Sequence, residues 1–180
     1  EIKVNDIDND GADEIIIACE WGPIRIYKNV NNALQEITAD LQLDTKTGWW
    51  NSINLHDLDN DGDLDILATN FGHNTKYKAS TSKPELLYYS DFDESGKLDI
   101  VEAKYEGNDL VPRRGFSCSQ LAMPFIKDKM KSFHNFASSS LSGIYSKTSI
   151  SSATKYEINT LESGVFINEK THFKFIKLPP

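Results

Sequence analysis

The chain has 180 residues, of which 39% are hydrophobic and 11% aromatic, and this composition is typical of a globular protein that is long enough to bury a core. Its formal net charge of −8 argues against a nucleic-acid-binding surface, because such surfaces neutralise phosphates with Lys and Arg. No apolar stretch approaches the roughly 20 residues that a membrane-spanning helix needs.

The N-terminal part of the chain alternates between short apolar runs and acidic loops. The runs are β-branched and predict strands, over 14–19, 23–29, 64–70 and 98–105. The acidic windows begin 51 and then 34 residues apart. The first spacing suits one four-stranded propeller blade, since such repeats run to about 40–50 residues. The second spacing is shorter and indicates that the third acidic loop joins strands within one blade.

Residues 107–157 have a helical pattern instead. Apolar residues recur there at steps of three to four and predict two or three short helices: Ile126, Met130, Phe133, Leu141 and Ile144. The serines at 138–140 indicate a break and a new N-cap, and 146–155 reads as a polar loop. Residues 164–179 then predict a hairpin with its turn near 168–171.

These elements predict an all-β fold, a partial β-propeller of about three blades with a small α-helical insertion. Residues 1–106 would form blades with the acidic loops, 107–157 the helical insertion, and 158–180 the return to propeller strands. Because a closed propeller needs about four to eight blades, we expect this chain to be a fragment of a larger propeller.

Three nine-residue windows hold 14 of the 27 acidic residues and one basic residue, Lys97. They are loop 1 (6–14), loop 2 (57–65) and loop 3 (91–99). Carboxylates at this density repel one another unless a cation neutralises them, which favours cation sites over solvated turns. A Gly at position 6 of each window supplies the positive φ that a curled loop needs.

The spacing D-x-D-x-D-G-x-x-[DE] offers side-chain oxygens at positions 1, 3, 5 and 9 and a backbone carbonyl at position 7. The predicted ligands of loop 1 are Asp6, Asp8, Asp10, the Ala12 carbonyl and Glu14. Those of loop 2 are Asp57, Asp59, Asp61, the Asp63 carbonyl and Asp65. Those of loop 3 are Asp91, Asp93, Ser95, the Lys97 carbonyl and Asp99.

An all-oxygen set without His or Cys favours Ca²⁺ over Zn²⁺ or copper, and Mg²⁺ is disfavoured because it retains several waters. We therefore expect Ca²⁺ in loops 1 and 2. Loop 3 is a third candidate, since Ser95 replaces an acid and Lys97 adds a positive charge there.

An EF-hand is the main alternative for these loops. It requires helices on both sides and a Glu at position 12 of its loop. That position is Ile17 in loop 1 and Ala68 in loop 2, and neither side chain can bind a metal ion. Loop 3 has Glu102 there, so the alternative stays open for loop 3.

With an acidic loop before each strand, the chain resembles the FG-GAP/VCBS repeat proteins, whose blades form integrin-α-like β-propellers. Phe71-Gly72 matches the FG element, and Gly22-Pro23 resembles a shortened GAP element. Residues 47–80, 110–126 and 161–179 are similar to a narrower branch, the cartilage-acidic-protein/UnbV (ASPIC) type of bacterial surface protein.

This resemblance implies a secreted or cell-surface protein that calcium stabilises. In a bacterium, such a protein would lie in the periplasm or on the outer surface. It also implies cell adhesion or recognition of a protein or glycan ligand. No G-x-S-x-G, H-E-x-x-H or phosphate-binding Gly loop occurs, so we expect no catalysis. The alternative is a fragment of a propeller-type polysaccharide lyase or glycoside hydrolase.

Several other residues have two interpretations each. Trp21, Trp49 and Trp50 would either pack between blades or stack on sugar rings. The adjacent arginines at 113 and 114 would either bind a ligand carboxylate or form salt bridges within the protein. The two cysteines, Cys19 and Cys118, are expected to be free, buried thiols rather than a disulfide.

Overall fold

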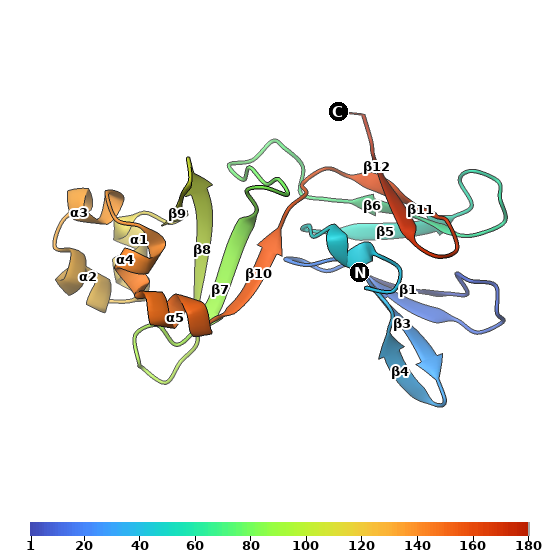
Figure 1. The fold of residues 1–180 in the computed structure, drawn as a ribbon, viewed down its shortest axis with the longest axis horizontal. Helices are drawn as coiled ribbons and strands as arrows, with labels where there is room; N and C mark the ends of the chain where they lie inside the picture. The colour runs from blue at the N-terminus through green and yellow to red at the C-terminus, as the bar shows by residue number, and fades with distance from the viewer. Residues whose placement is uncertain (180) are drawn as a thin grey trace. The chain divides into compact units, whose positions relative to one another are not determined.

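The structure is a computed structural model that describes residues 1–179, and over this range it contains three four-stranded sheets and five short α-helices (Figure 1). The chain divides into two compact units. Unit 1 comprises residues 1–81 together with those from 158 onward, and unit 2 comprises residues 82–157. No helix within the described range is long and apolar enough to cross a membrane.

The first sheet of unit 1 is an antiparallel meander in the order β1-β2-β3-β4. Its strands are β1 (Ile2–Asn5), β2 (Glu14–Ile17), β3 (Arg25–Val30) and β4 (Ala33–Glu36). Ile16 and Ile26 are fully buried, as the apolar runs at 14–19 and 23–29 predict. Loop 1 joins β1 to β2.

The second sheet of unit 1 takes strands from both ends of the chain, in the order β12-β11-β6-β5. Its strands are β5 (Ser52–His56), β6 (Asp65–Thr69), β11 (Gly164–Asn168) and β12 (Phe173–Lys177). Starting from the strand before the acidic loop, β5-β6-β11-β12 repeats the arrangement β1-β2-β3-β4. The predicted C-terminal hairpin is therefore confirmed, and it completes a blade that unit 2 interrupts after β6.

This split blade accounts for the short spacing between loops 2 and 3. The chain leaves the second sheet after two strands and starts a third sheet, instead of finishing the blade first. Loop 3 then joins β7 to β8 in that third sheet.

The core of unit 1 packs aromatic side chains among aliphatic ones, most of them isoleucines. Trp50 is 1% exposed, and its ring centroid lies 5.4 Å from that of Phe166 and 6.0 Å from that of Phe175. Trp50 is thus a core residue, and its buried ring does not form a surface for stacking on sugars.

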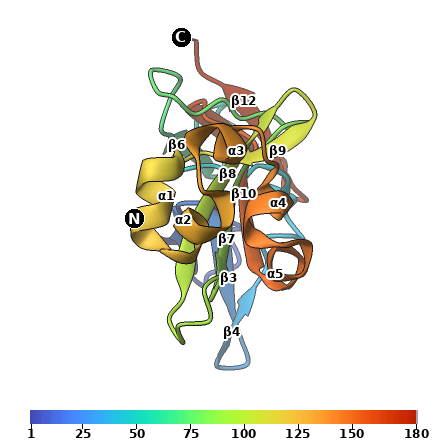
Figure 2. The ribbon, with the colours of Figure 1, turned by 90° about the vertical axis from the view of Figure 1, so that its left-hand side faces the viewer.

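The sheet of unit 2 has the order β10-β7-β8-β9, and the helices gather on one side of it (Figure 2). Its strands are β7 (Glu85–Ser90), β8 (Asp99–Glu106), β9 (Asp109–Pro112) and β10 (Thr154–Ile158). Its helices are α1 (Phe116–Ala122), α2 (Phe125–Met130), α3 (Phe133–Ala137), α4 (Leu141–Tyr145) and α5 (Lys147–Ser152). Apolar residues of the strands and helices form one buried cluster. The predicted division into blades (1–106), helical insertion (107–157) and returning strands (158–180) refers to a larger propeller and stays a prediction.

The helical segment differs from the prediction in number and extent. Five helices form instead of two or three, and α5 with part of β10 occupies the range 146–155 that was predicted as a polar loop. The Ser146 side chain caps α5 by accepting a hydrogen bond from the Ser149 N–H. Apolar periodicity missed α5 because its only large apolar residue is Ile150. Ser140 caps α4 as predicted.

The two cysteines are free, as predicted, but they are not both buried. Cys19 is half-buried, while Cys118 on α1 is exposed. Cys118 falls on the solvent side of a short helix whose buried residues are Phe116 and Ser119, and the isolated cysteine gives no indication of that orientation.

Gly164 provides a stability test for the split blade. An added Cβ at this position would lie 2.7 Å from the Ile176 carbonyl and would overlap the Phe175 ring. We expect Gly164→Ala to destabilise unit 1 by about 1–3 kcal/mol, measured by urea unfolding followed by Trp fluorescence. Gly143→Ala is the control, since its added Cβ meets only ordinary contacts at 3.5 Å or more. Equal unfolding midpoints for the two variants would contradict this packing.

Candidate metal centre

Each acidic loop connects two neighbouring strands of one sheet. Loop 1 lies between β1 and β2, loop 2 between β5 and β6, and loop 3 between β7 and β8. An EF-hand needs helices in both flanking positions. The structure therefore excludes the EF-hand alternative for loop 3 as well as for loops 1 and 2.

The three loops share one hydrogen-bond framework. The position-1 carboxylate accepts the N–H groups of positions 5 and 6 at 2.8–3.2 Å. The position-5 side chain accepts the N–H of position 7 at 2.9–3.4 Å. The position-9 carboxylate reaches back to the N–H of position 2 at 2.9–3.1 Å. These bonds fix the loop backbone and the directions of the predicted ligands.

Two positive-φ residues make this framework possible in each loop. The Gly at position 6 has φ between 81° and 95° in the three loops, as the sequence predicts. Position 4 also has positive φ, and is Asn9, Asn60 or Glu94. Asn tolerates this left-handed region better than most residues, which explains its place in loops 1 and 2.

In every loop three carboxylates converge. Their oxygens lie within 4.8 Å of one another in the groups Asp6–Asp8–Asp10, Asp57–Asp59–Asp61 and Asp91–Asp93–Asp99. Calcium binds oxygens at about 2.3–2.6 Å, so two ligands on opposite sides of one ion are about 5 Å apart. The spacing and the all-oxygen chemistry of these groups fit a calcium ion.

In each loop a hydrogen bond connects the predicted ligands at positions 5 and 7. Ala12, Asp63 and Lys97, at position 7, donate their N–H groups to the side chains of Asp10, Asp61 and Ser95. This hydrogen bond fixes the peptide groups at position 7, whose carbonyls are predicted ligands.

In loops 1 and 2 the position-9 carboxylates are the most buried of the predicted ligands. Glu14 and Asp65 are both 0% exposed. Both oxygens of Asp65 accept backbone N–H groups, whereas Glu14 uses Oε2 for the Ile7 N–H and leaves Oε1 buried without a hydrogen-bond donor. Burial raises the pKa of Glu14 and of Asp99, its counterpart in loop 3. A cation beside these carboxylates would offset the cost of burying them as anions.

The side-chain ligands of loop 2 are crowded by like charge. Desolvation, followed by the charge of Asp61, raises the pKa of Asp59. In loop 3 the opposite holds for Asp93, because a hydrogen bond from the Ser95 side chain lowers its pKa. A cation beside Asp59 would relieve this repulsion.

A comparison with protein families gives a match over the part of the chain that contains loops 1 and 2. Residues 6–68 match the family model of FG-GAP-like repeats. This stretch is therefore similar to an FG-GAP-like repeat. It extends from Asp6, the first predicted ligand of loop 1, to the end of the buried part of β6. Neither the curated proteins nor the solved structures compared with the chain gave a match.

Loops 1 and 2 are connected by two asparagines, one in loop 1 and one outside the matched stretch. The Asn9 side chain donates to Asp63 Oδ1 at 3.1 Å. Asn168, at the end of β11 and only 6% exposed, donates its side chain to the carbonyls of Ile7 and Leu64 at 3.0 and 3.3 Å. Its backbone N–H donates to Asp65. The sequence marked Asn168 only as a turn residue, because nothing local shows that β11 pairs with β6.

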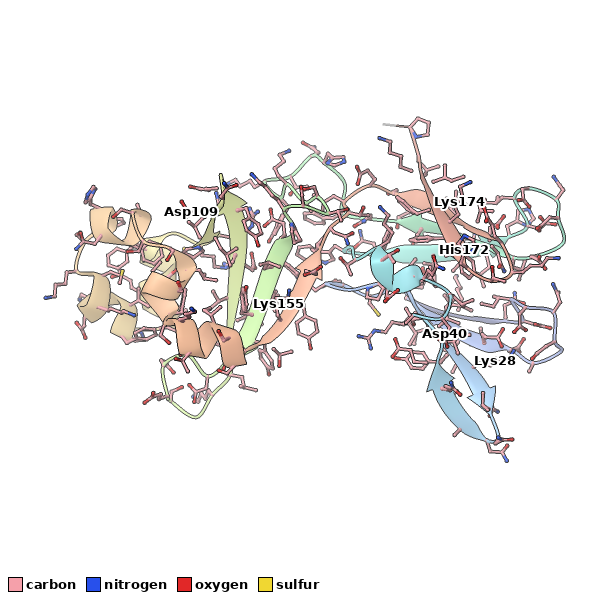
Figure 3. The ribbon with its side chains drawn as sticks, viewed as in Figure 1. Lys28, Asp40, Asp109, Lys155, His172 and Lys174 are labelled. Atoms are coloured by element: carbon pink, nitrogen blue, oxygen red, sulfur yellow. The ribbon has the colours of Figure 1, made fainter. Side chains whose placement is uncertain are left out.

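Sequence reasoning also missed Lys28 on β3 (Figure 3). Its ammonium forms ion pairs with Asp8 and Asp10 and lies 3.8 Å from Glu14 Oε1. Hydrogen bonds to Asp10 and Asp8 raise the pKa of Lys28, and the same contact lowers the pKa of Asp10. The only sequence signal is a Lys at the last position but one of the strand predicted over 23–29, and that gives no indication of its partners.

The aromatic and arginine candidates have partners within their own units. Trp49 stacks on Phe71 with a centroid distance of 4.7 Å, and Trp21 lies 5.6 Å from Trp49.

Arg113 pairs with Glu85 of β7, and Arg114 pairs with Glu102 of β8 at 3.3 Å. Of the two readings for these arginines, the structure favours salt bridges to the strands of unit 2.

Asn168 gives a direct test of the connection between the loops. We expect Asn168→Ala to lower the free energy of unfolding by about 1–3 kcal/mol, because it leaves the buried carbonyls of Ile7 and Leu64 without these donors. Urea unfolding measures the effect, and Asn74→Ala in an exposed loop is the control. An Asn168→Ala midpoint equal to that of the control would show that the bridge contributes nothing to stability.

Proposed function

We propose that this chain is a calcium-binding FG-GAP/VCBS-type module of an extracellular or cell-surface protein, with a role in adhesion or in recognising a protein or glycan. The observation that carries the proposal is the repeated framework of hydrogen bonds that brings three carboxylates together in each loop. In each loop the carboxylate oxygens lie within 4.8 Å of one another, which is close enough for one calcium ion to bind all three, and this supports a common role as cation sites.

The donor set assigns roles to individual residues. In loop 2, Asp57, Asp59 and Asp61 would hold the ion together with the Asp63 carbonyl and Asp65. Bound calcium would supply the positive charge that these carboxylates lack. Since β2, β6 and β8 each begin at position 9 of a loop, a neutralised loop would hold the first residue of its strand in place.

The proposed location follows from the chemistry of calcium. Extracellular modules bind Ca²⁺ with dissociation constants of about 10⁻⁴–10⁻³ M, and such sites fill only where calcium is abundant. We also propose that the chain belongs to the UnbV (ASPIC) branch, on the similarity of residues 47–80, 110–126 and 161–179. The module would act by binding and not by catalysis.

Calcium removal tests the metal part of this proposal. We expect EDTA to lower the melting temperature by several degrees and Ca²⁺ to restore it, with Mg²⁺ restoring it poorly. At a Kd of about 10⁻⁴ M, a tenfold excess of Ca²⁺ stabilises by about 1.4 kcal/mol per occupied site. Differential scanning calorimetry in EDTA, Ca²⁺ and Mg²⁺ measures the shift.

Variants then localise the effect. Asp59→Asn in loop 2 should reduce the calcium-dependent shift, whereas Asp40→Asn, an exposed acid of unit 1 outside the loops, should retain it (Figure 3). Asp93→Asn and Asp109→Asn form the equivalent pair in unit 2. A melting temperature that is identical in EDTA and in Ca²⁺ would refute calcium binding by all three loops.

A second experiment separates recognition from catalysis. We expect the protein to co-sediment with at least one member of a panel of insoluble polysaccharides in Ca²⁺ but not in EDTA. No reducing ends should be released, because the predicted carboxylate ligands would be held by an ion and would be poor proton donors. Release of reducing ends by the purified chain would instead support a polysaccharide-cleaving enzyme. A panel without any binding would refute glycan recognition.

A further inference from the structure

The Lys28 ammonium lies among the predicted ligands of loop 1. Lys28 Nζ forms ion pairs with Asp8 and Asp10, the latter at 2.6 Å, and is 3.8 Å from Glu14 Oε1. These three acids are three of the five ligands predicted for loop 1. Glu14 Oε1 is buried and has no hydrogen-bond donor, so the ammonium is the positive charge nearest to it.

The register of the first sheet places Lys28 there. β2 and β3 pair Ile16 with Ile26 and Ile15 with Tyr27. Continuing this register by one pair sets Glu14, the position-9 residue of loop 1, opposite Lys28. The side chain then reaches along the edge of the loop toward Asp8 and Asp10. The position of Lys28 beside loop 1 thus depends on strand pairing within the blade and not on the acidic motif.

The corresponding position in the second blade lacks a charge. β6 and β11 pair Ile66 with Phe166, so the same one-pair extension sets Asp65 opposite Ile167. Within residues 1–179, no ion pair reaches the carboxylates of Asp57, Asp59 or Asp61. Lys170 pairs with Asp63, which is predicted to bind an ion through its backbone carbonyl rather than its side chain.

Loop 3 also lacks such a strand-borne charge. β9 pairs with β8 only as far as Pro112 opposite Ala103, and it ends before it could face Asp99. Loop 1 is therefore the loop in which a neighbouring strand supplies a cation, and loop 2, with the same framework and an Ile in that place, is a natural control within the same unit.

We propose that Lys28 is an internal counter-ion of loop 1 that must leave Asp8 and Asp10 before calcium can bind there. This inference rests on the proposed calcium-binding function and adds a residue that sets the affinity of one site. An ammonium and a divalent ion held by the same carboxylates would lie close enough to repel each other strongly, so they compete for Asp8 and Asp10. Loop 1 consequently keeps its shape without calcium and binds calcium more weakly than loop 2.

The partial burial of the ammonium favours this role. The Lys28 side chain is 23% exposed, while Asp8 and Asp10 are 44% and 43% exposed. The two ion pairs are therefore partly shielded from solvent. Several such pairs must break together when Lys28 leaves. We expect this cost to weaken calcium binding at loop 1 by about tenfold relative to a variant without the ammonium.

Calcium titration of the ¹⁵N-labelled protein tests the inference loop by loop. Gly11, Gly62 and Gly96 each donate an N–H to the position-1 carboxylate of their own loop, so their amide signals report on each loop separately. In the unaltered protein the Gly62 signal should shift at lower Ca²⁺ than the Gly11 signal. Lys28→Met should lower the Gly11 midpoint by about tenfold and leave the Gly62 midpoint unchanged.

Lys3→Met is the matched control. Lys3 lies on β1 of the same sheet and pairs with Glu1, which is outside the loop. It should move neither midpoint. Melting temperatures provide a second readout: Lys28→Met should be less stable than the unaltered protein in EDTA, and this difference should disappear in saturating Ca²⁺. If Lys28→Met does not fold without calcium, Lys28→Gln is measured in the same way.

The outcomes distinguish the inference from the function on which it rests. A Gly62 shift with a Gly11 midpoint that Lys28→Met leaves unchanged would overturn the counter-ion role while retaining calcium binding. Absence of any calcium response at all three glycines would refute the proposed function, and the counter-ion role with it.

Discussion

The mutual repulsion of carboxylates at the start of a buried strand is the constraint on which both units depend. Position 9 of each loop is the first residue of β2, β6 or β8, and in loops 1 and 2 its carboxylate has no exposed surface. Backbone N–H groups of positions 2, 5, 6 and 7 offset part of this charge through hydrogen bonds to the loop side chains. A cation beside the loop would offset more of it and would hold the start of the strand in place.

The same constraint explains how one blade tolerates a long interruption. Unit 2 separates β6 from β11 in the chain, yet β11 returns to the correct register beside β6. Asn168 stabilises that register, because only in this register do its N–H groups donate hydrogen bonds to Ile7, Leu64 and Asp65 together. A slip by one residue would turn the Asn168 side chain to the other face of the sheet and break these bonds.

Local pattern was enough to predict the loops, the strands that follow them and the C-terminal hairpin, because turn chemistry and strand periodicity are properties of neighbouring residues. The features that were missed depend on pairing between distant segments. Lys28 faces Glu14 only through the β2–β3 register, and Asn168 bridges two loops more than 100 residues away. Helix α5 was missed for a different reason: its stability comes from a Ser cap and one apolar contact instead of an apolar stripe.

The three loops show that the acidic motif determines the backbone conformation of the loop more firmly than it determines which cation neutralises it. One hydrogen-bond framework appears with a lysine from the next strand in loop 1, with uncompensated carboxylates in loop 2, and with Ser95 and Lys97 within loop 3. Each of these differences changes the local charge and leaves the backbone geometry alone. If Lys28 acts as proposed, the number of ions that such a repeat binds depends on the residue opposite position 9, which lies outside the motif and is visible only once the strands are paired.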